Sequence, residues 1–167
     1  MAGFFYDGIY DQRNFTNIIS VYPSLSFLLF TMNNVTVSDC CNGLILCWCL
    51  GTDGYRYVVC SPASQELKVL PPRIHSIGEA RLGFNSTASL HFHVFEYMDE
   101  DGQCMGVDIY SSKTTVWIFK ESKWGEEPEW TLSKSATVFL NGCLHYIGLC
   151  EGYRRILVCI SGSSGLH

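Results

Sequence analysis

The sequence predicts an all-β protein built from antiparallel sheets, and three observations lead to this fold class. Aromatic residues make up 14% of the 167 residues and there are 15 glycines, a composition typical of short strands joined by tight turns. No stretch shows the apolar period of an amphipathic helix. The third observation is an internal repeat of about 50 residues, which is the signature of a repeated structural unit.

The repeat is visible when the sequence is compared with itself. A shift of 99 residues places NGLILCWCLGTDGYRYVVC (residues 42–60) on NGCLHYIGLCEGYRRILVC (residues 141–159) without a gap. A shift of 49 residues places CSPAS (residues 60–64) on IYSSK (residues 109–113), where an apolar segment again runs into a turn of small residues. Three units are therefore expected, at approximately residues 42–72, 90–120 and 141–160.

Each unit is predicted to consist of strands separated by turns. Residues 44–50 are apolar throughout, as expected of a strand buried on both faces. The GTDG that follows supplies a hairpin turn, with glycine available for positive φ. The expected strands are residues 44–50, 55–60, 66–70, 90–97, 104–110, 115–120, 143–149 and 154–160. The apolar segment 18–32 is shorter than the ~20 residues of a membrane span and is predicted to form buried strands.

Antiparallel units at this period are typical of β-propeller blades, which pack against a neighbour on each face. The sequence thus predicts one domain over residues 1–167, a partial propeller of about three blades. The third unit lacks a counterpart of residues 66–70, so we expect the propeller to be truncated at its C-terminal end. A β-sandwich with coincidental internal similarity is the alternative.

Five of the 9 cysteines fall within residues 39–60. Cys47 and Cys49 share one face of the predicted strand, whereas Cys40 and Cys41 point to opposite sides, and these spacings do not suit a zinc site. Cys60 and Cys159 match at the shift of 99, and Ile109 takes the third matching position. Since packing tolerates an exchange of Cys for Ile and coordination does not, the cysteines are predicted to fill strands as small apolar side chains.

No other constellation indicates chemistry. The motifs of nucleotide-binding loops and serine hydrolases are absent from the sequence, so we predict no catalytic residue, no metal and no cofactor. His91, His93 and His145 could form a metal site only if the fold brought them together. The one candidate contact surface for a protein partner is the segment around GEEPE, and its residues are Trp124, Glu126, Glu127 and Trp130.

The net charge of −5 argues against nucleic acid as a partner, because phosphates require a basic face. The N-terminus shows no basic start followed by an apolar core, so a secreted protein is not expected. These features favour a cytoplasmic or nuclear protein without a membrane segment.

CCNGLILC and YVVCSPASQELKVLPP, within residues 40–72, form a Cys-Asn-Gly-Leu strand followed by a strand–turn–strand ending in Leu-Pro-Pro. This order of segments resembles that of plant F-box-associated domains. Ser61 stands where that family usually has Asn, and serine can make the same local turn hydrogen bond. The later segments that carry the resemblance are GFFY, HFHVFEY, VDIYSSKTTVW and FLNGCLHYIG.

The resemblance implies a kelch-like propeller that binds a target protein within a Skp–cullin–F-box ubiquitin ligase. In such ligases an N-terminal F-box binds the Skp adaptor, and this sequence is expected to begin inside the associated domain, without that F-box. The function expected is therefore non-catalytic recognition of a target protein in protein ubiquitination. The alternatives are a propeller enzyme of the oxidase or glycosidase type and a truncated product without function.

Overall fold

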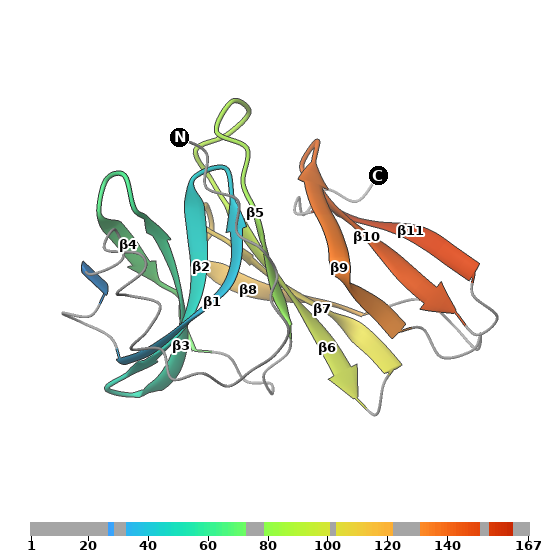
Figure 1. Ribbon diagram of the computed structural model, residues 1–167, viewed down its shortest axis with the longest axis horizontal. Coiled ribbons are helices and arrows are strands. Elements are labelled where there is room, and N and C mark those ends of the chain that lie inside the picture. The colour runs from blue at the N-terminus through green and yellow to red at the C-terminus, as the bar shows by residue number, and fades with distance from the viewer. Residues whose placement is uncertain are drawn as a thin grey trace.

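The computed structural model describes residues 27–28, 33–72, 79–100, 103–121, 131–150 and 154–161. Within these residues the chain forms β-strands, turns and a short 3-10 turn at Phe27 and Leu28. The strands make three antiparallel sheets that stand side by side (Figure 1). The predicted all-β architecture of antiparallel sheets is confirmed.

The strands follow one another in sequence across each sheet. Sheet A consists of β1 (Asn33–Cys41), β2 (Leu44–Gly51), β3 (Gly54–Ser61) and β4 (Glu66–Val69). Sheet B consists of β5 (Ala80–Gly83), β6 (His93–Glu100), β7 (Gln103–Ser111) and β8 (Val116–Glu121). Sheet C consists of β9 (Thr131–Leu140), β10 (Cys143–Cys150) and β11 (Arg154–Ser161).

Strand β2 is buried on both faces, as its uninterrupted apolar sequence predicts. Leu46 belongs to the core between sheets A and B. Its neighbours along the strand, Ile45 and Cys47, belong to a second core on the other face of sheet A. Because successive side chains of a strand point to opposite faces, one apolar strand serves two cores.

The three cores account for the stacking of the sheets. The core between sheets A and B contains Leu46, Tyr57, Val59, Leu70, Ala80, Leu82, Phe92, Val94 and Tyr110. The core between sheets B and C contains Phe95, Tyr97, Val107, Ile109 and Leu144, with Phe139 packed against it. The core on the outer face of sheet A contains Leu28, Val35, Ile45, Cys47, Cys49, Val58 and Cys60. Sheet B is therefore packed on both faces, as a propeller blade is.

The first strands of the three sheets, β1, β5 and β9, lie next to one another where the sheets meet. Polar contacts join these strands. The Asp39 carboxylate on β1 accepts a hydrogen bond from the Leu82 amide on β5 at 2.7 Å. Arg81 on β5 donates from Nε to the Thr137 hydroxyl on β9 at 3.1 Å. Gly83 makes the approach of β5 and β9 possible, since a Cβ there would lie 2.5 Å from the nearest carbon of the Phe139 ring.

The turn between β9 and β10 has the same conformation as the turn between β1 and β2. Asn42 and Gly43 have φ of 47° and 85°, and Asn141 and Gly142 have φ of 52° and 77°. Asn-Gly with positive φ at both positions is the preferred two-residue hairpin. The two turns are 99 residues apart, which is the shift at which the sequence matches itself.

Beyond these turns, the ungapped alignment of the repeat units is out of register by one residue. The turns after β3 and β7 carry positive φ at Gln65 and Thr115, so the true shift between sheets A and B is 50. In sheet C, β10 pairs Leu144 with Ile160, whereas β2 pairs Ile45 with Cys60. Three residues separate Cys150 from Arg154, whereas two separate Gly51 from Gly54. The extra residue shifts the pairing of β11 by one position relative to that of β3. Tyr110 and Ile160 therefore occupy the positions that match Cys60, in place of Ile109 and Cys159.

The innermost strands β1, β5 and β9 were not predicted, because their sequences are polar or short. The predicted strand at residues 90–97 begins only at His93. Of segment 18–32, predicted as buried strands, only Phe27 and Leu28 are described, and there the prediction is wrong because these two residues form a 3-10 turn. Leu28 is nevertheless fully buried against sheet A.

Candidate functional site

The connections at one end of the three sheets form a common surface, which we call the loop face. Antiparallel strands reverse at each connection, so the odd-numbered strands of each sheet end on this side (the top of Figure 1). The loop face consists of turns 42–43, 62–65, 112–115 and 141–142 and of loop 84–92. Of these residues only Lys113 carries a formal charge.

Loop 84–92 is held in shape by its own hydrogen bonds. The backbone oxygen of Asn85 accepts from the Ser89 amide at 2.9 Å. The side-chain oxygen of Asn85 accepts from the amide and the hydroxyl of Thr87 at 3.1 and 2.7 Å. The amide of His91 donates to the Ser89 hydroxyl at 3.0 Å. Leu90 lies between these bonds with 86% of its surface exposed, so an ordered loop presents an apolar side chain to solvent.

Both ends of this loop are fixed to neighbouring turns. The Phe84 oxygen accepts hydrogen bonds from Asn42 Nδ2 at 2.6 Å and from the Cys41 thiol at 3.3 Å, which ties the loop to sheet A. Phe92 exchanges two bonds with Ser112, one to its hydroxyl at 2.9 Å and one from its amide at 3.0 Å. The position of Leu90 is therefore set by two sheets.

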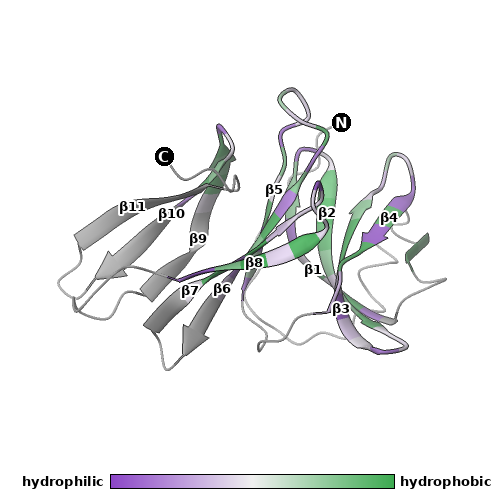
Figure 2. Ribbon diagram, turned by 180° about the vertical axis from the view of Figure 1, so that it is seen from behind, coloured by the Kyte–Doolittle hydropathy of each residue, from purple (hydrophilic) through white to green (hydrophobic). Residues whose placement is uncertain are grey.

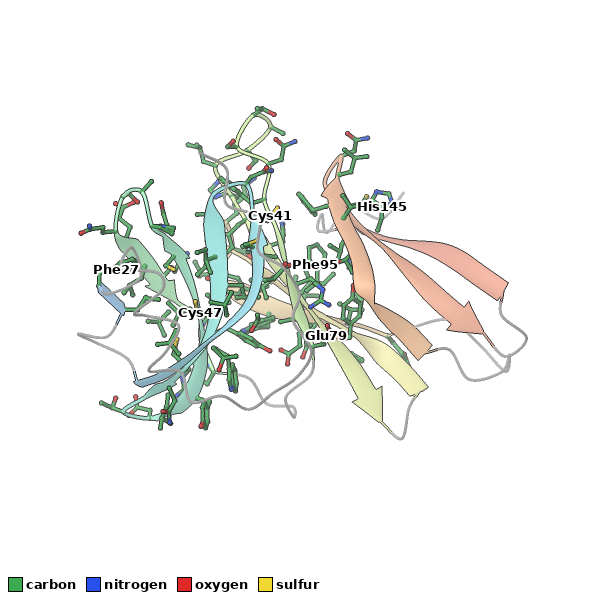
Figure 3. The ribbon with its side chains drawn as sticks, in the orientation of Figure 1. Phe27, Cys41, Cys47, Glu79, Phe95 and His145 are labelled. Atoms are coloured by element: carbon green, nitrogen blue, oxygen red, sulfur yellow. The ribbon has the colours of Figure 1, made fainter. Side chains whose placement is uncertain are left out.

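A second exposed apolar pair lies on sheet C near the loop face. Val138 and Leu140 of β9 are 59% and 55% exposed, and they pair across the sheet with His145 and Cys143. Phe139, between them, packs on the core shared with sheet B. Val138 and Leu140 consequently lie on the face of sheet C that points away from sheet B. Figure 3 shows His145 toward the same end of the sheets as Cys41.

The predicted contact residues Trp124, Glu126, Glu127 and Trp130 lie outside the described residues. Their segment joins the end of β8 to the start of β9, and both of those strand ends are at the end opposite the loop face (Figure 1). The sequence missed Leu90 because it was assigned to a strand. The signal that could have found it is a lone leucine within the polar run NSTASLH.

Three cysteines of β2 and β3 fill the outer core of sheet A, as predicted, whereas the prediction is wrong for Cys40 of β1, which is exposed. Cys47, Cys49 and Cys60 are free thiols with 0% exposure. Hydrogen bonds with the Cys49 and Cys60 thiols, and then burial, raise the pKa of Cys47. Cys40 is exposed and Cys41 half-buried. In the part of the chain that the structure describes, no three His, Cys, Asp or Glu side chains are arranged to hold a metal ion.

His91 and His93, considered above as metal ligands, differ in their surroundings. His93 is half-buried against Phe95, with 6.1 Å between ring centroids, and burial lowers its pKa. His91 is exposed on the loop face.

Among described residues, no helix is long and apolar enough to cross a bilayer.

Stacked antiparallel sheets whose first strands lie next to one another are the architecture of propeller blades. The sequence matches the family model of the F-box associated beta propeller domain over residues 12–161, and the chain belongs to this family. A search of curated proteins gives no match. The resemblance inferred from CCNGLILC and the later segments is thus confirmed.

Proposed function

We propose that this chain is the non-catalytic, target-binding part of a Skp–cullin–F-box ubiquitin ligase and acts in the cytoplasm or nucleus. Membership of the F-box associated propeller family supports a role in recognition of a target protein. The observation that carries the proposal is Leu90, an apolar side chain 86% exposed on a loop that two sheets hold in place. A pre-organised loop loses little entropy when it binds, which favours recognition.

The loop face also indicates the chemistry of the contact. The loop face surrounds Leu90 with amide and hydroxyl groups, and Lys113 is its one formally charged residue. A target surface with a small apolar pocket and an uncharged rim would complement it, since anchors of this kind lie at the centre of interfaces and polar groups at their rim. Binding of this kind depends little on salt, unlike an interface built on charge.

Trp124, Glu126, Glu127 and Trp130 remain proposed contacts with the target protein. Two tryptophans and two carboxylates in one segment suit a basic or apolar patch on the same target. Contact with the Skp adaptor is assigned to an F-box, as in other ligases of this type, and not to the sheets.

The experiment is a fusion of this chain to an F-box that binds the Skp adaptor, expressed in cells whose proteome is quantified. We expect proteins that gain ubiquitin with the wild-type fusion to lose this gain with Leu90→Ser. Val69→Ser is the matched control, because Val69 is 42% exposed on β4, away from the loop face. A set of ubiquitinated proteins unaffected by Leu90→Ser, or no ubiquitinated protein at all, would contradict the proposal.

A further inference from the structure

Lys68 is a cation set into the junction between sheets A and B. It lies on β4, the outer strand of sheet A, and its ammonium group donates a hydrogen bond to the backbone oxygen of Ser112 at 3.3 Å. The same group lies 6.0 Å from the centroid of the Phe92 ring and 5.9 Å from that of the Tyr110 ring. These distances are at the limit of a cation–π contact. One half-buried side chain of sheet A therefore contacts a carbonyl group and two rings on the other side of the junction.

Ser112 links this cation to loop 84–92. Its amide donates to the Phe92 oxygen at 3.0 Å, and its hydroxyl accepts from the Phe92 amide at 2.9 Å. Ser112 is thus bonded both to β4 and to the end of the loop. Phe92 is the last residue of the loop and follows Leu90 by two positions. A continuous series of hydrogen bonds therefore runs from β4 to the segment that presents Leu90.

The other end of the loop is also held by sheet A. Asn42 Nδ2 donates to the Phe84 oxygen at 2.6 Å. Sheet A consequently reaches the first residue of the loop through Asn42, and the last residue through Lys68 and Ser112. A loop held at both ends by a neighbouring sheet has fewer accessible conformations than one held at a single end.

The cation is found where the long loop is. Sheets A and C join their first two strands by the Asn-Gly turns 42–43 and 141–142, whereas sheet B joins them by loop 84–92. In sheet B the register position that matches Lys68, 50 residues later, holds Ile118. Figure 2 shows this contrast between the two outer strands, with hydrophilic residues on β4 and hydrophobic residues on β8. Packing of one sheet on the next therefore does not require a cation here, which indicates that Lys68 serves the loop.

We infer that Lys68 is a positioning residue for target recognition: through Ser112 and Phe92 it holds loop 84–92, and with it Leu90, in the conformation offered to the target. This inference rests on the proposed function and adds a residue that controls the same site from another sheet. Removal of the ammonium group takes away a charged hydrogen bond and two ring contacts. The loop should then open more often, and a smaller population of the chain should be competent to bind.

Hydrogen exchange of the amides in loop 84–92 measures this opening, and the measurement needs no target protein. Lys68→Met keeps an unbranched side chain and loses the charge. It should raise the exchange rates of the loop amides at least about fivefold. Lys68→Arg keeps a cation with hydrogen-bond donors that can also stack on rings, and its exchange rates should stay within about twofold of the wild type.

Trp117→Phe is the matched control. It removes the hydrogen bond from the Trp117 indole to the Pro71 oxygen at 3.1 Å, a bond that joins the same two sheets but does not involve Ser112. Overall stability should fall, while loop exchange should stay within about twofold of the wild type. Ser112→Ala removes the hydroxyl that accepts from the Phe92 amide and should speed loop exchange as Lys68→Met does. Because both changes act on one series of contacts, their combined effect should be smaller than the product of the single effects.

Recognition is measured with the F-box fusion, on the proteins whose ubiquitination depends on Leu90. Lys68→Met should lower this ubiquitination at least about threefold, and Lys68→Arg and Trp117→Phe should not. The inference is overturned by unchanged loop exchange in Lys68→Met, by an equal rise of loop exchange in Trp117→Phe, or by unchanged ubiquitination of the Leu90-dependent proteins in Lys68→Met.

These outcomes leave the proposed function intact, because it is tested by Leu90→Ser. If the loop amides behave as expected and the wild-type fusion ubiquitinates no protein, the hold of Lys68 on the loop is supported and the ligase role is wrong.

Discussion

The contact between Asp39 and Leu82 offers the sharpest test of how sheets A and B are joined. Leu82 is buried, with 2% of its surface exposed, and the Asp39 carboxylate accepts its amide hydrogen at 2.7 Å. The other carboxylate oxygen accepts from the Cys40 amide at 2.8 Å. Asp39→Ala leaves the Leu82 amide without this acceptor, and a buried donor that loses a charged partner costs about 1.5–3 kcal/mol. Asp39→Asn keeps an oxygen at the same place and is the matched control.

The measurement is urea unfolding followed by tryptophan fluorescence, with the free energy of unfolding compared at constant pH. We expect Asp39→Ala to lose about 1.5–3 kcal/mol and Asp39→Asn to lose less than about 1 kcal/mol. If the two variants are equally stable, the Leu82 amide does not depend on an acceptor at position 39. That result would refute the reasoning about the junction of β1 and β5.

The same residue predicts a dependence on pH. Burial raises the pKa of the Asp39 carboxyl, while hydrogen bonds from the Leu82 and Cys40 amides partly oppose this shift. A folded-state pKa above the unfolded value of about 3.9 means that protonation favours the folded state. This contribution is fully present below about pH 3.9 and is lost as the pH rises through the folded pKa. Relative to Asp39→Asn, the wild type should therefore lose stability as the pH rises, and a difference that moves the other way would contradict the shift.

Three further predictions concern packing, thiols and the loop face. Gly83→Ala should lower the free energy of unfolding by about 1–3 kcal/mol, because its Cβ would overlap the Phe139 ring, and Phe139→Leu should restore part of the loss in a double-mutant cycle. In the native protein a thiol reagent should modify Cys40 rapidly and Cys47 only after denaturation, as their exposures require; rapid native modification of Cys47 would disprove its place in the core. Leu90→Ser should change stability by less than about 0.5 kcal/mol, since the side chain is 86% exposed, and a larger loss in thermal melting would mean that Leu90 has a structural role.

Much of the local structure follows from short stretches of sequence. The Asn-Gly pairs at residues 42–43 and 141–142 require the same tight turn wherever they stand, because both positions need positive φ. The apolar run of β2 and the return strand β3 could likewise be read directly, since period and turn chemistry are local properties. The cysteines within these strands were predicted as core for the same reason, and Cys47, Cys49 and Cys60 are buried.

The first strands of the sheets could not be read in this way. The four residues of β5, ARLG, have no strong pattern, and they form a strand because β6 pairs with them on one side and the β1 carboxylate of Asp39 binds on the other. The one-residue errors in matching the repeats have a similar origin. An ungapped comparison cannot detect an extra residue in a connection such as that between Cys150 and Arg154, although it changes every pairing along β11.

The sequence by itself determined that this chain forms antiparallel strands of two-sided apolar character with Asn-Gly turns, because propensity, period and turn conformation are encoded within a few residues. The tertiary structure decided which residues face solvent and which face a neighbouring sheet. Leu90 is exposed because loop 84–92 is closed by its own hydrogen bonds above the sheets. Val116 and Ile118 are 48% and 44% exposed on β8, the outer strand of sheet B. Exposure depends on contacts between segments distant in sequence, and no local pattern specifies them.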